Sequence, residues 1–301
     1  MEFSVNDILG ERESFVFRLK ITQSFKRKKY VEIIENIDID RIVTTISPNW
    51  LELKTLQDEF KYNDNYRNNI QSLTNKYCAW KKVRGDGNCY YRAVMSTYIT
   101  KIFHFNQHEN RIFQLIGLLE SFSLCQMDSD YKDSIIAVLE TIKELYLKSL
   151  KSIESKIEVF KEVCQLLQKI EFDRHLVATS RIISYITLNS EQGDSIKPFL
   201  TESELESINT RILTMNTEAE GVELSLCPLA LKITVNQVNI FDKIIFNAFP
   251  VDLEGMVDNE VKPIVDIISK SRGHYDALYS IKDMEEDDYC LEKMQYCCDI
   301  E

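Results

Sequence analysis

RGDGNCYYRA, residues 84–93, places two glycines, an Asp, an Asn and a Cys within a few positions and then becomes apolar and aromatic. Glycines permit positive φ and let the backbone approach a ligand closely. Asp and Asn favour turns and helix starts. The residues that follow, YYRAVMSTYI, contain neither Gly nor Pro. The pattern predicts a tight loop that ends where a helix begins, with Cys89 at the junction.

A thiol at that junction has a chemical consequence. It lies at the positive end of the helix dipole, beside N–H groups without helical partners, and both favour the thiolate. The loop around Gly87 and Asn88 could also supply N–H groups to a developing oxyanion. On this stretch alone, a buried structural cysteine beside a turn is the alternative interpretation.

A thiolate nucleophile needs a base, and His274 is the best candidate among the four histidines. It lies in SRGHYDALYS, directly after Gly273, in an alternating pattern typical of a strand. Residues i and i+2 of a strand share a face, so the side chains of His274 and Asp276 point the same way. A carboxylate beside an imidazole fixes its tautomer and stabilises the imidazolium. Cys89, His274 and Asp276 therefore form a candidate triad.

The other three histidines are weaker candidates. His104 and His108 have i, i+4 spacing, which could suit a metal, but the sequence offers no obvious third ligand. His175 lies in a helical context, FDRHLVA, and is interpreted as structural. We expect no metal site.

The overall composition excludes several classes of function. The 301 residues include 48 acidic and 36 basic residues, a formal net charge of −12, which argues against a nucleic-acid-binding face. The start of the chain lacks a signal-peptide pattern, and no stretch approaches the ~20 apolar residues of a membrane helix. We expect a soluble protein of the cytoplasm, with the nucleus as an alternative. The eight cysteines include no CxxC pair and are expected to be free thiols, mostly small buried side chains.

Helical and strand patterns divide the chain. From residue 117 to 193 no Gly or Pro intervenes, and apolar residues from Ile135 to Leu167 recur every three or four positions, predicting one long helix or two in succession that face the core. Thr201 and Glu204 have the spacing of a capping box. After Gly221 the period changes to two, as in strands. A helix-rich part followed by a strand-rich part indicates an α+β fold with a mostly antiparallel sheet.

The two motifs together, RGDGNCYYRA and GHYDALY, resemble the ovarian-tumour (OTU) deubiquitinases, and the otubain branch, peptidase C65, in particular. The stretch that leads into the Cys motif and the long helix-filled spacer before His274 are similar to otubains. The resemblance covers about residues 48–282, as a catalytic domain. It leaves residues 1–47 as an N-terminal extension, for which a helix is one interpretation. Residues 283–301 remain as an acidic, Cys-containing tail, for which a final helix is favoured over an interaction tail. The implied fold is the OTU fold, an α+β relative of papain-like cysteine proteases.

The resemblance also implies roles for the motif residues. Cys89 would be the nucleophile, His274 the general base and Asp276 its orienting carboxylate. Asp86 would organise the loop, its backbone N–H would help to form the oxyanion hole, and the resemblance places it among the catalytic residues. Gly87 and Asn88 would support the oxyanion and the loop. No cofactor or metal is implied. Two positions depart from the family: Tyr90 replaces the usual Phe, and Gly85 stands where otubains often have Pro.

The activity that the resemblance implies is hydrolysis of the isopeptide bond after the C-terminal glycine of ubiquitin. The expected partners are ubiquitin or polyubiquitin chains, and ubiquitin-conjugating enzymes in addition. Two alternatives remain at this point: a module that binds ubiquitin or a conjugating enzyme without catalysis, and a protease for another ubiquitin-like modifier.

Overall fold

A computed structural model describes residues 45–60, 62–104, 109–125, 127–241, 243–250, 264–271, 273–285 and 294–295. The segment before the Cys motif forms two short strands and two helices. These are β1 (Trp50–Glu52), α2 (Thr55–Glu59), α3 (Asp64–Leu73) and β2 (Tyr77–Lys81). The Asn63 side chain caps α3 by accepting from the N–H of Tyr66.

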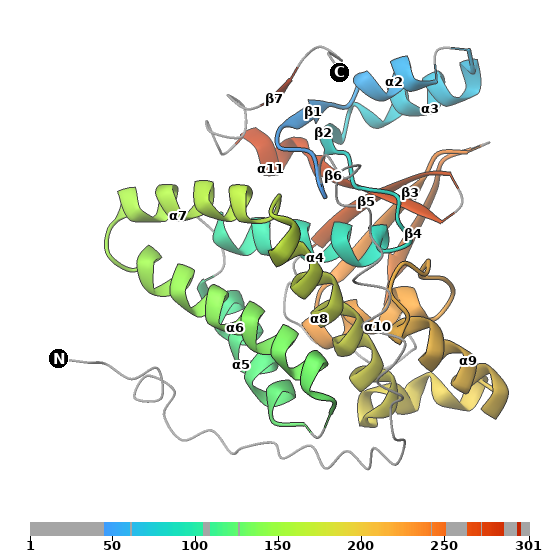
Figure 1. Ribbon diagram of the computed structural model, residues 1–301. Coiled ribbons are helices and arrows are strands. Elements are labelled where there is room, and N and C mark those ends of the chain that lie inside the picture. Colours follow the sequence, from blue (N-terminus) through green and yellow to red (C-terminus); the bar gives the residue numbers. More distant parts are fainter. Residues whose placement is uncertain are drawn as a thin grey trace.

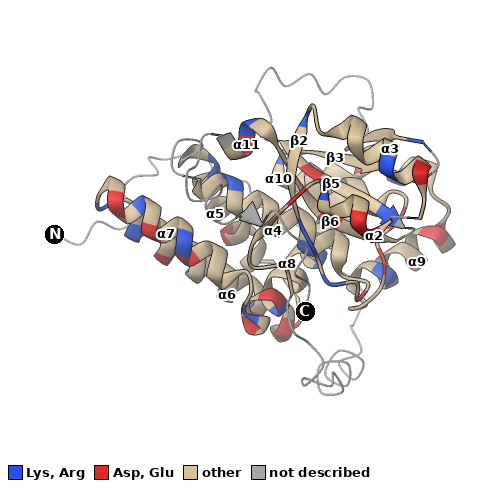
Figure 2. Cartoon of the chain, turned by 90° about the horizontal axis from the view of Figure 1, so that it is seen from above, with Lys and Arg blue, Asp and Glu red and all other residues tan. Residues whose placement is uncertain are grey.

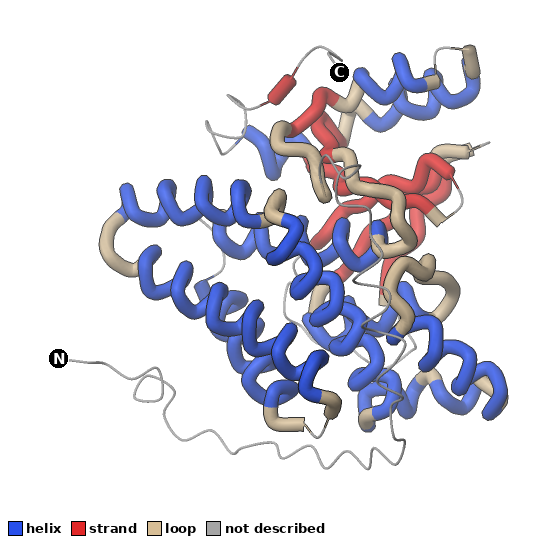
Figure 3. Tube along the Cα trace, viewed as in Figure 1, coloured by secondary structure: helices blue, strands red, loops and turns tan. Residues whose placement is uncertain are grey.

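In the described residues, seven α-helices lie between β2 and β3 in the chain and form the large helical region on one side of the molecule (Figures 1 and 3). They are α4 (Cys89–Phe103), α5 (Glu109–Ser123), α6 (Ser129–Ser149), α7 (Ile153–Leu166), α8 (Ile170–Asn189), α9 (Glu202–Leu213) and α10 (Glu223–Leu231). Two short 3-10 helices, at Glu191–Ser195 and Lys197–Phe199, connect α8 to α9. The predicted capping box at Thr201 and Glu204 is confirmed.

The stretch between residues 117 and 193 holds more helices than predicted. The apolar stripe from Ile135 to Leu167 divides into α6 and α7, and α8 follows before Gly193. A polar side chain makes the break, since Ser152 accepts a hydrogen bond from the N–H of Ser155 and starts α7 without any glycine or proline. Acidic and basic residues both lie along α7 (Figure 2).

The last third supplies most of the sheet. It contains β3 (Thr234–Asn239), β4 (Ile245–Phe249), β5 (Ile264–Ser271), β6 (His274–Ser280), the short helix α11 (Ile281–Glu285) and β7 (Met294–Gln295). The predicted alternation begins later than expected, because Leu231 ends α10 and Lys232 turns the chain in a left-handed conformation.

Within the described residues, seven strands form one sheet in the order β4-β3-β5-β6-β2-β1-β7. The pairs β3–β5 and β1–β7 are parallel, and the other four are antiparallel. The predicted α+β fold with a mostly antiparallel sheet is therefore confirmed. Two strands come from before the Cys motif, which the sequence did not indicate. Parts of the tail at residues 283–285 and 294–295 are described, and the favoured final helix is wrong at Met294 and Gln295, which pair with β1.

The sheet has a core on each face. On one face, β6 residues Tyr275, Ala277 and Tyr279 join the main core with α4 to α8. On the other, Leu278 joins a smaller core that is covered by α2 and α3. The alternation of strand β6 therefore places Asp276, like Leu278, on the side of α2 and α3.

Helix α4 is the central element of the main core. Every residue of α4 except Lys101 is buried, because the helix lies between the sheet and the helices α5, α7 and α8 (Figure 1). The sequence had indicated an apolar face only. This burial fixes the start of α4, and with it Cys89, relative to the sheet.

Residues 1–44 lie outside the described residues, so the predicted extension over residues 1–47 stays a prediction, as does the boundary of the catalytic domain at residues 48–282. Among the helices that the structure describes, none is long and apolar enough to cross a membrane.

Candidate active site

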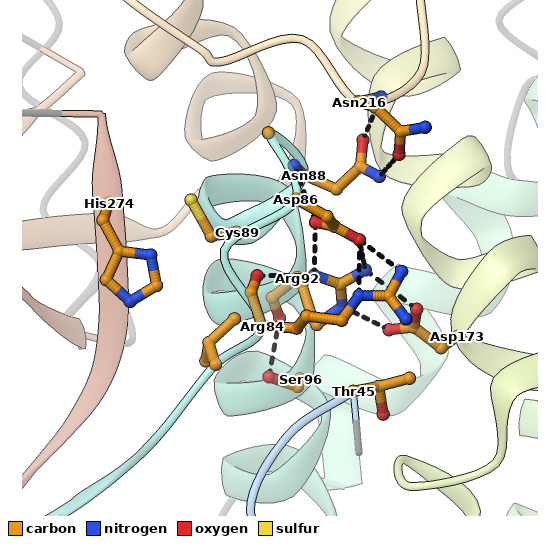
Figure 4. Close-up of polar contacts among 12 residues, drawn as sticks. Thr45, Arg84, Asp86, Asn88, Cys89, Arg92, Ser96, Asp173, Asn216 and His274 are labelled. Carbon is orange, nitrogen blue, oxygen red and sulfur yellow. Dashed lines mark hydrogen bonds and ion pairs between the residues drawn. The ribbon is translucent and has the colours of Figure 1, made fainter. Parts of the chain in front are cut away.

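Cys89 is the first residue of α4, with Asn88 as the N-cap, as predicted. The loop that precedes it turns at Gly87, whose φ is +78°. The Cys89 sulfur points toward the strand that carries His274 (Figure 4), and Sγ lies 3.2 Å from the carbonyl oxygen of Gly273. The thiol is thus at a helix N-terminus and beside the start of β6, although only 2% of the residue is exposed.

His274 and Asp276 share one face of β6, as the alternation predicted. His274 Nε2 lies 3.2 Å from Asp276 Oδ1, and the same oxygen accepts a hydrogen bond of 2.7 Å from the N–H of Val83. The carboxylate is completely buried. Strand β2 ends at Lys81, so the Val83 N–H that follows it is free to hold the orienting carboxylate.

The electrostatics of this pair favour a protonated imidazole. Hydrogen bonds with Asp276 and then with the Cys89 thiol raise the pKa of His274 to about 9, although burial opposes the shift. Burial alone would raise the pKa of Asp276, but the hydrogen bond from His274 and the charge of Lys270 outweigh it and lower that pKa. The predicted residues Cys89, His274 and Asp276 therefore lie together, with the orienting carboxylate ionised.

Asp86 organises the loop, on the side away from His274. Its Oδ1 accepts from the N–H of Asn88 at 3.0 Å and from Arg92 Nη1 at 2.9 Å, and its Oδ2 accepts from Arg84 and Arg92 (Figure 4). Arg92 also donates to both oxygens of Asp173, at 2.7 and 3.0 Å. Burial would raise the pKa of Asp86, but Arg92 and Arg84 lower it well below its ordinary range. The carboxylate partner of His274 is Asp276, not Asp86.

Asn88 is held by two residues that the sequence analysis missed. Its Oδ1 accepts from Arg181 on α8 at 2.8 Å and from the N–H of Asn216 at 3.0 Å, and its Nδ2 donates to the Asn216 side chain at 2.8 Å. Arg181 also donates to the Gly87 carbonyl at 3.1 Å. Because the Asn88 N–H is bonded to Asp86, both the backbone and the side chain of Asn88 support the loop. The sequence signal was slight: one arginine inside the apolar stretch LVATSRIISY.

The segment between α9 and α10 borders the site on both sides. A Cβ on Gly87 would lie 2.3 Å from the Asn216 carbonyl oxygen, and a Cβ on Gly273 would lie 1.9 Å from the Glu218 carboxylate. On Gly85, a Cβ would come within 3.1 Å of His274 Nδ1. Gly87 is required here by the Asn216 backbone and by its positive φ, and Gly273 is favoured by its φ of +71°.

The sequence model of the family described as Peptidase C65 Otubain matches residues 39–280. The chain belongs to the otubain family. A comparison with curated protein sequences gives no significant match.

Solved structures support the otubain fold. A structure described as h/ceOTUB1-ubiquitin aldehyde-UBC13~Ub matches with a TM-score of 0.65 and 17% identity, over 83% of this chain and 95% of that chain. A ceOTUB1 ubiquitin aldehyde UBC13~Ub complex gives 0.65 and 18%, over 84% and 99%. A third, with UBCH5B~Ub, gives 0.64 and 17%, over 83% and 95%. At this identity the likeness establishes the OTU fold, which was predicted.

The remaining histidines of this otubain are structural where they are described. The His104 ring packs edge-on against Phe160, and His175 Nδ1 lies 3.3 Å from Ser134 Oγ. His108 lies outside the described residues. Within the described ranges no three His, Cys, Asp or Glu side chains group as metal ligands would, and Cys89, Cys125 and Cys227 are free cysteines.

Proposed function

We propose that this otubain is a thiol-dependent hydrolase that cleaves the isopeptide bond after the C-terminal glycine of ubiquitin. The observation that carries the proposal is the thiol at the N-terminus of α4 beside an imidazole on β6 that is paired with the buried Asp276 carboxylate. Otubain membership supports ubiquitin as the modifier.

In the proposed reaction the Cys89 thiolate attacks the carbonyl carbon of the terminal glycine. Backbone N–H groups at the start of α4 and in the loop stabilise the tetrahedral oxyanion. The protonated His274 gives its proton to the departing lysine amine, which leaves a thioester on Cys89. His274 then takes a proton from water, which attacks the thioester and releases ubiquitin. Asp276 holds the imidazole throughout through the 3.2 Å contact with Nε2.

Otubain membership also implies a narrow groove over Cys89, which would accept a tail of glycines and exclude residues with larger side chains.

The test is labelling of the full chain by ubiquitin that carries a C-terminal thiol-reactive group. The proposal expects one covalent adduct, on Cys89, and none with Cys89→Ala. The matched control is Cys227→Ala: Cys227 is completely buried, and burial raises the pKa of its thiol to about 12, so labelling should be unchanged. Labelling that survives Cys89→Ala, or no labelling of the native chain, would contradict the proposal.

Binding without catalysis is the second candidate. It is favoured by the similar structures, in which OTUB1 is complexed with ubiquitin aldehyde and with UBC13~Ub or UBCH5B~Ub. In a pull-down with a ubiquitin-charged conjugating enzyme, this function expects equal retention of the native chain and of Cys89→Ala. An unlabelled chain that is retained would establish this candidate in place of the hydrolase.

A further inference from the structure

Lys270 is a buried lysine on strand β5, beside the site but absent from both motifs. Only 7% of its side chain is exposed. The strand pair β5–β6 changes register there: Ser269 pairs with Tyr275 and Ser271 with His274, so Lys270 is the extra residue of a bulge. A bulge redirects a side chain and is frequent next to active sites. Lys270 lies on the sheet face covered by α2 and α3, like Ile268 two residues before it.

The ammonium group of Lys270 is placed between two carboxylates. Nζ lies 2.8 Å from Asp276 Oδ2 and 2.9 Å from Glu59 Oε2 on α2, and it lies 4.3 Å from the centre of the Trp80 ring. The Tyr66 hydroxyl of α3 donates to the Lys270 carbonyl. A buried ammonium is costly unless it is paired, and here it is paired on both sides.

The two oxygens of Asp276 have different partners. Oδ1 faces His274 Nε2 and the Val83 N–H, whereas Oδ2 faces Lys270. A carboxylate that rotated by a half turn about its Cβ–Cγ bond would exchange these oxygens, and one held on one side only could swing away from the imidazole. Lys270 and the Val83 N–H fix it from two directions.

We propose that Lys270 is a positioning residue for the hydrolase site, which holds Asp276 so that one carboxylate oxygen stays directed at His274. The proposal rests on the proposed function for the site. Through Glu59 it also links the site to α2, in the layer that precedes the Cys motif. Lys270 touches neither the thiol nor the imidazole, so its effect passes through Asp276.

Loss of the ammonium has an electrostatic effect of known direction. The charged groups around the imidazole are Asp276 on β6, Lys270 on β5, the Cys89 thiol on α4 and the Glu218 carboxylate against Gly273. Removal of the cation leaves a more negative surrounding, which favours the imidazolium. The alkaline limb of activity should therefore move to higher pH, while the loosened carboxylate lowers the rate.

The experiment measures kcat and KM of the full chain on ubiquitin with a fluorogenic C-terminal leaving group, across pH. Lys270→Met should lower kcat by about 10- to 100-fold, the range expected when a reacting group is displaced by ~1 Å, with little change in KM. Lys270→Arg keeps the charge and should recover most of the rate. Glu59→Gln leaves the Lys270–Asp276 pair and should change kcat less than Lys270→Met.

A double-mutant cycle separates positioning from folding. In an Asp276→Asn background, Lys270→Met should have almost no further effect on kcat. An equal loss in both backgrounds, or a Lys270→Met chain with native kcat and native pH profile, would overturn the proposal. If the native chain hydrolyses no ubiquitin substrate, the proposed function has failed, and Lys270 is tested separately by the rate at which iodoacetamide alkylates Cys89, measured from peptide masses across pH. A shifted alkaline transition in Lys270→Met supports the positioning role. A profile identical to that of the native chain refutes it.

Discussion

Arg92 is the residue whose loss should affect this fold most directly. Its guanidinium lies between two carboxylates and bonds to both oxygens of each, with N–O distances of 2.7 and 3.0 Å to Asp173 and 2.9 Å to both oxygens of Asp86. Its side chain is 2% exposed, and those of Asp173 and Asp86 are 5% and 16% exposed. Arg92→Met fills the space but leaves two buried carboxylates near each other without the cation between them.

The magnitude follows from that burial. Removal of one partner of a buried, hydrogen-bonded ion pair costs about 3–5 kcal/mol, because the remaining charge stays out of water. The total stability of a domain is about 5–15 kcal/mol, so the variant would lose a large part of it. The Asp86 pKa should also rise in the variant, since Arg92 is the main group that lowers it against burial.

Urea unfolding followed by tryptophan fluorescence is a suitable assay, because Trp50 and Trp80 are buried. Arg84→Met is the matched control: its side chain is 23% exposed and contacts Asp86 only from outside, so a loss of about 1 kcal/mol or less is expected. Asp173→Asn removes one carboxylate and keeps the pair with Asp86, so it should cost less than Arg92→Met. If Arg92→Met unfolds within 1 kcal/mol of the native chain, as a surface pair would, the reasoning is refuted.

Four further predictions concern pH and the glycines. Because the pKa of His274 is raised to about 9 by Asp276 and then by Cys89, kcat/KM should stay constant through neutral pH and fall as the pH rises through 9. The stability that the protonated ring contributes is complete below about pH 6.5, the pKa of an unfolded histidine, and is lost as the pH rises through about 9. Asp276→Asn should move this limb to lower pH and reduce kcat by roughly 10²–10⁴, and an unmoved limb would contradict the assignment. Gly87→Ala should destabilise the fold by about 1–3 kcal/mol in urea, since φ is +78° and the Asn216 carbonyl occupies the Cβ position. Gly117→Ala, in an exposed part of α5 with no atom within 4 Å, should raise stability by about 0.5–1 kcal/mol, and a lowered melting temperature would contradict that.

The fold class could be predicted because its signals are local. The capping box at Thr201, the helix start at Cys89 and the alternation of β6 all depend on neighbours within four residues. The order of the sheet depends on contacts between distant segments, and β1 and β2 are too short to leave a pattern. The break between α6 and α7 escaped prediction because a serine cap, rather than glycine or proline, makes it.

For the site, too, the local signals could be predicted from the sequence and the long-range contacts could not. Cys89, His274 and Asp276 were identified because two short motifs carry them, and their spacing on a loop–helix junction and a strand has a chemical meaning. The residues that hold these side chains were not identified, because the sequence does not distinguish a buried arginine or lysine, such as Arg181 or Lys270, from one on the surface. Only the packing of α8 beneath the loop, and of α2 over β5, gives these cations their partners.

The nearly complete burial of α4 has a consequence for hydrogen–deuterium exchange. A helix enclosed on all sides can open its backbone only when the whole domain opens, so its amides should exchange at the rate set by global unfolding. Cys89 begins that helix, so its position should persist up to the melting temperature, and labelling of Cys89 by the thiol-reactive ubiquitin should be lost on heating only at melting. The Cys89 thiol should then stay in place for as long as the core itself is folded.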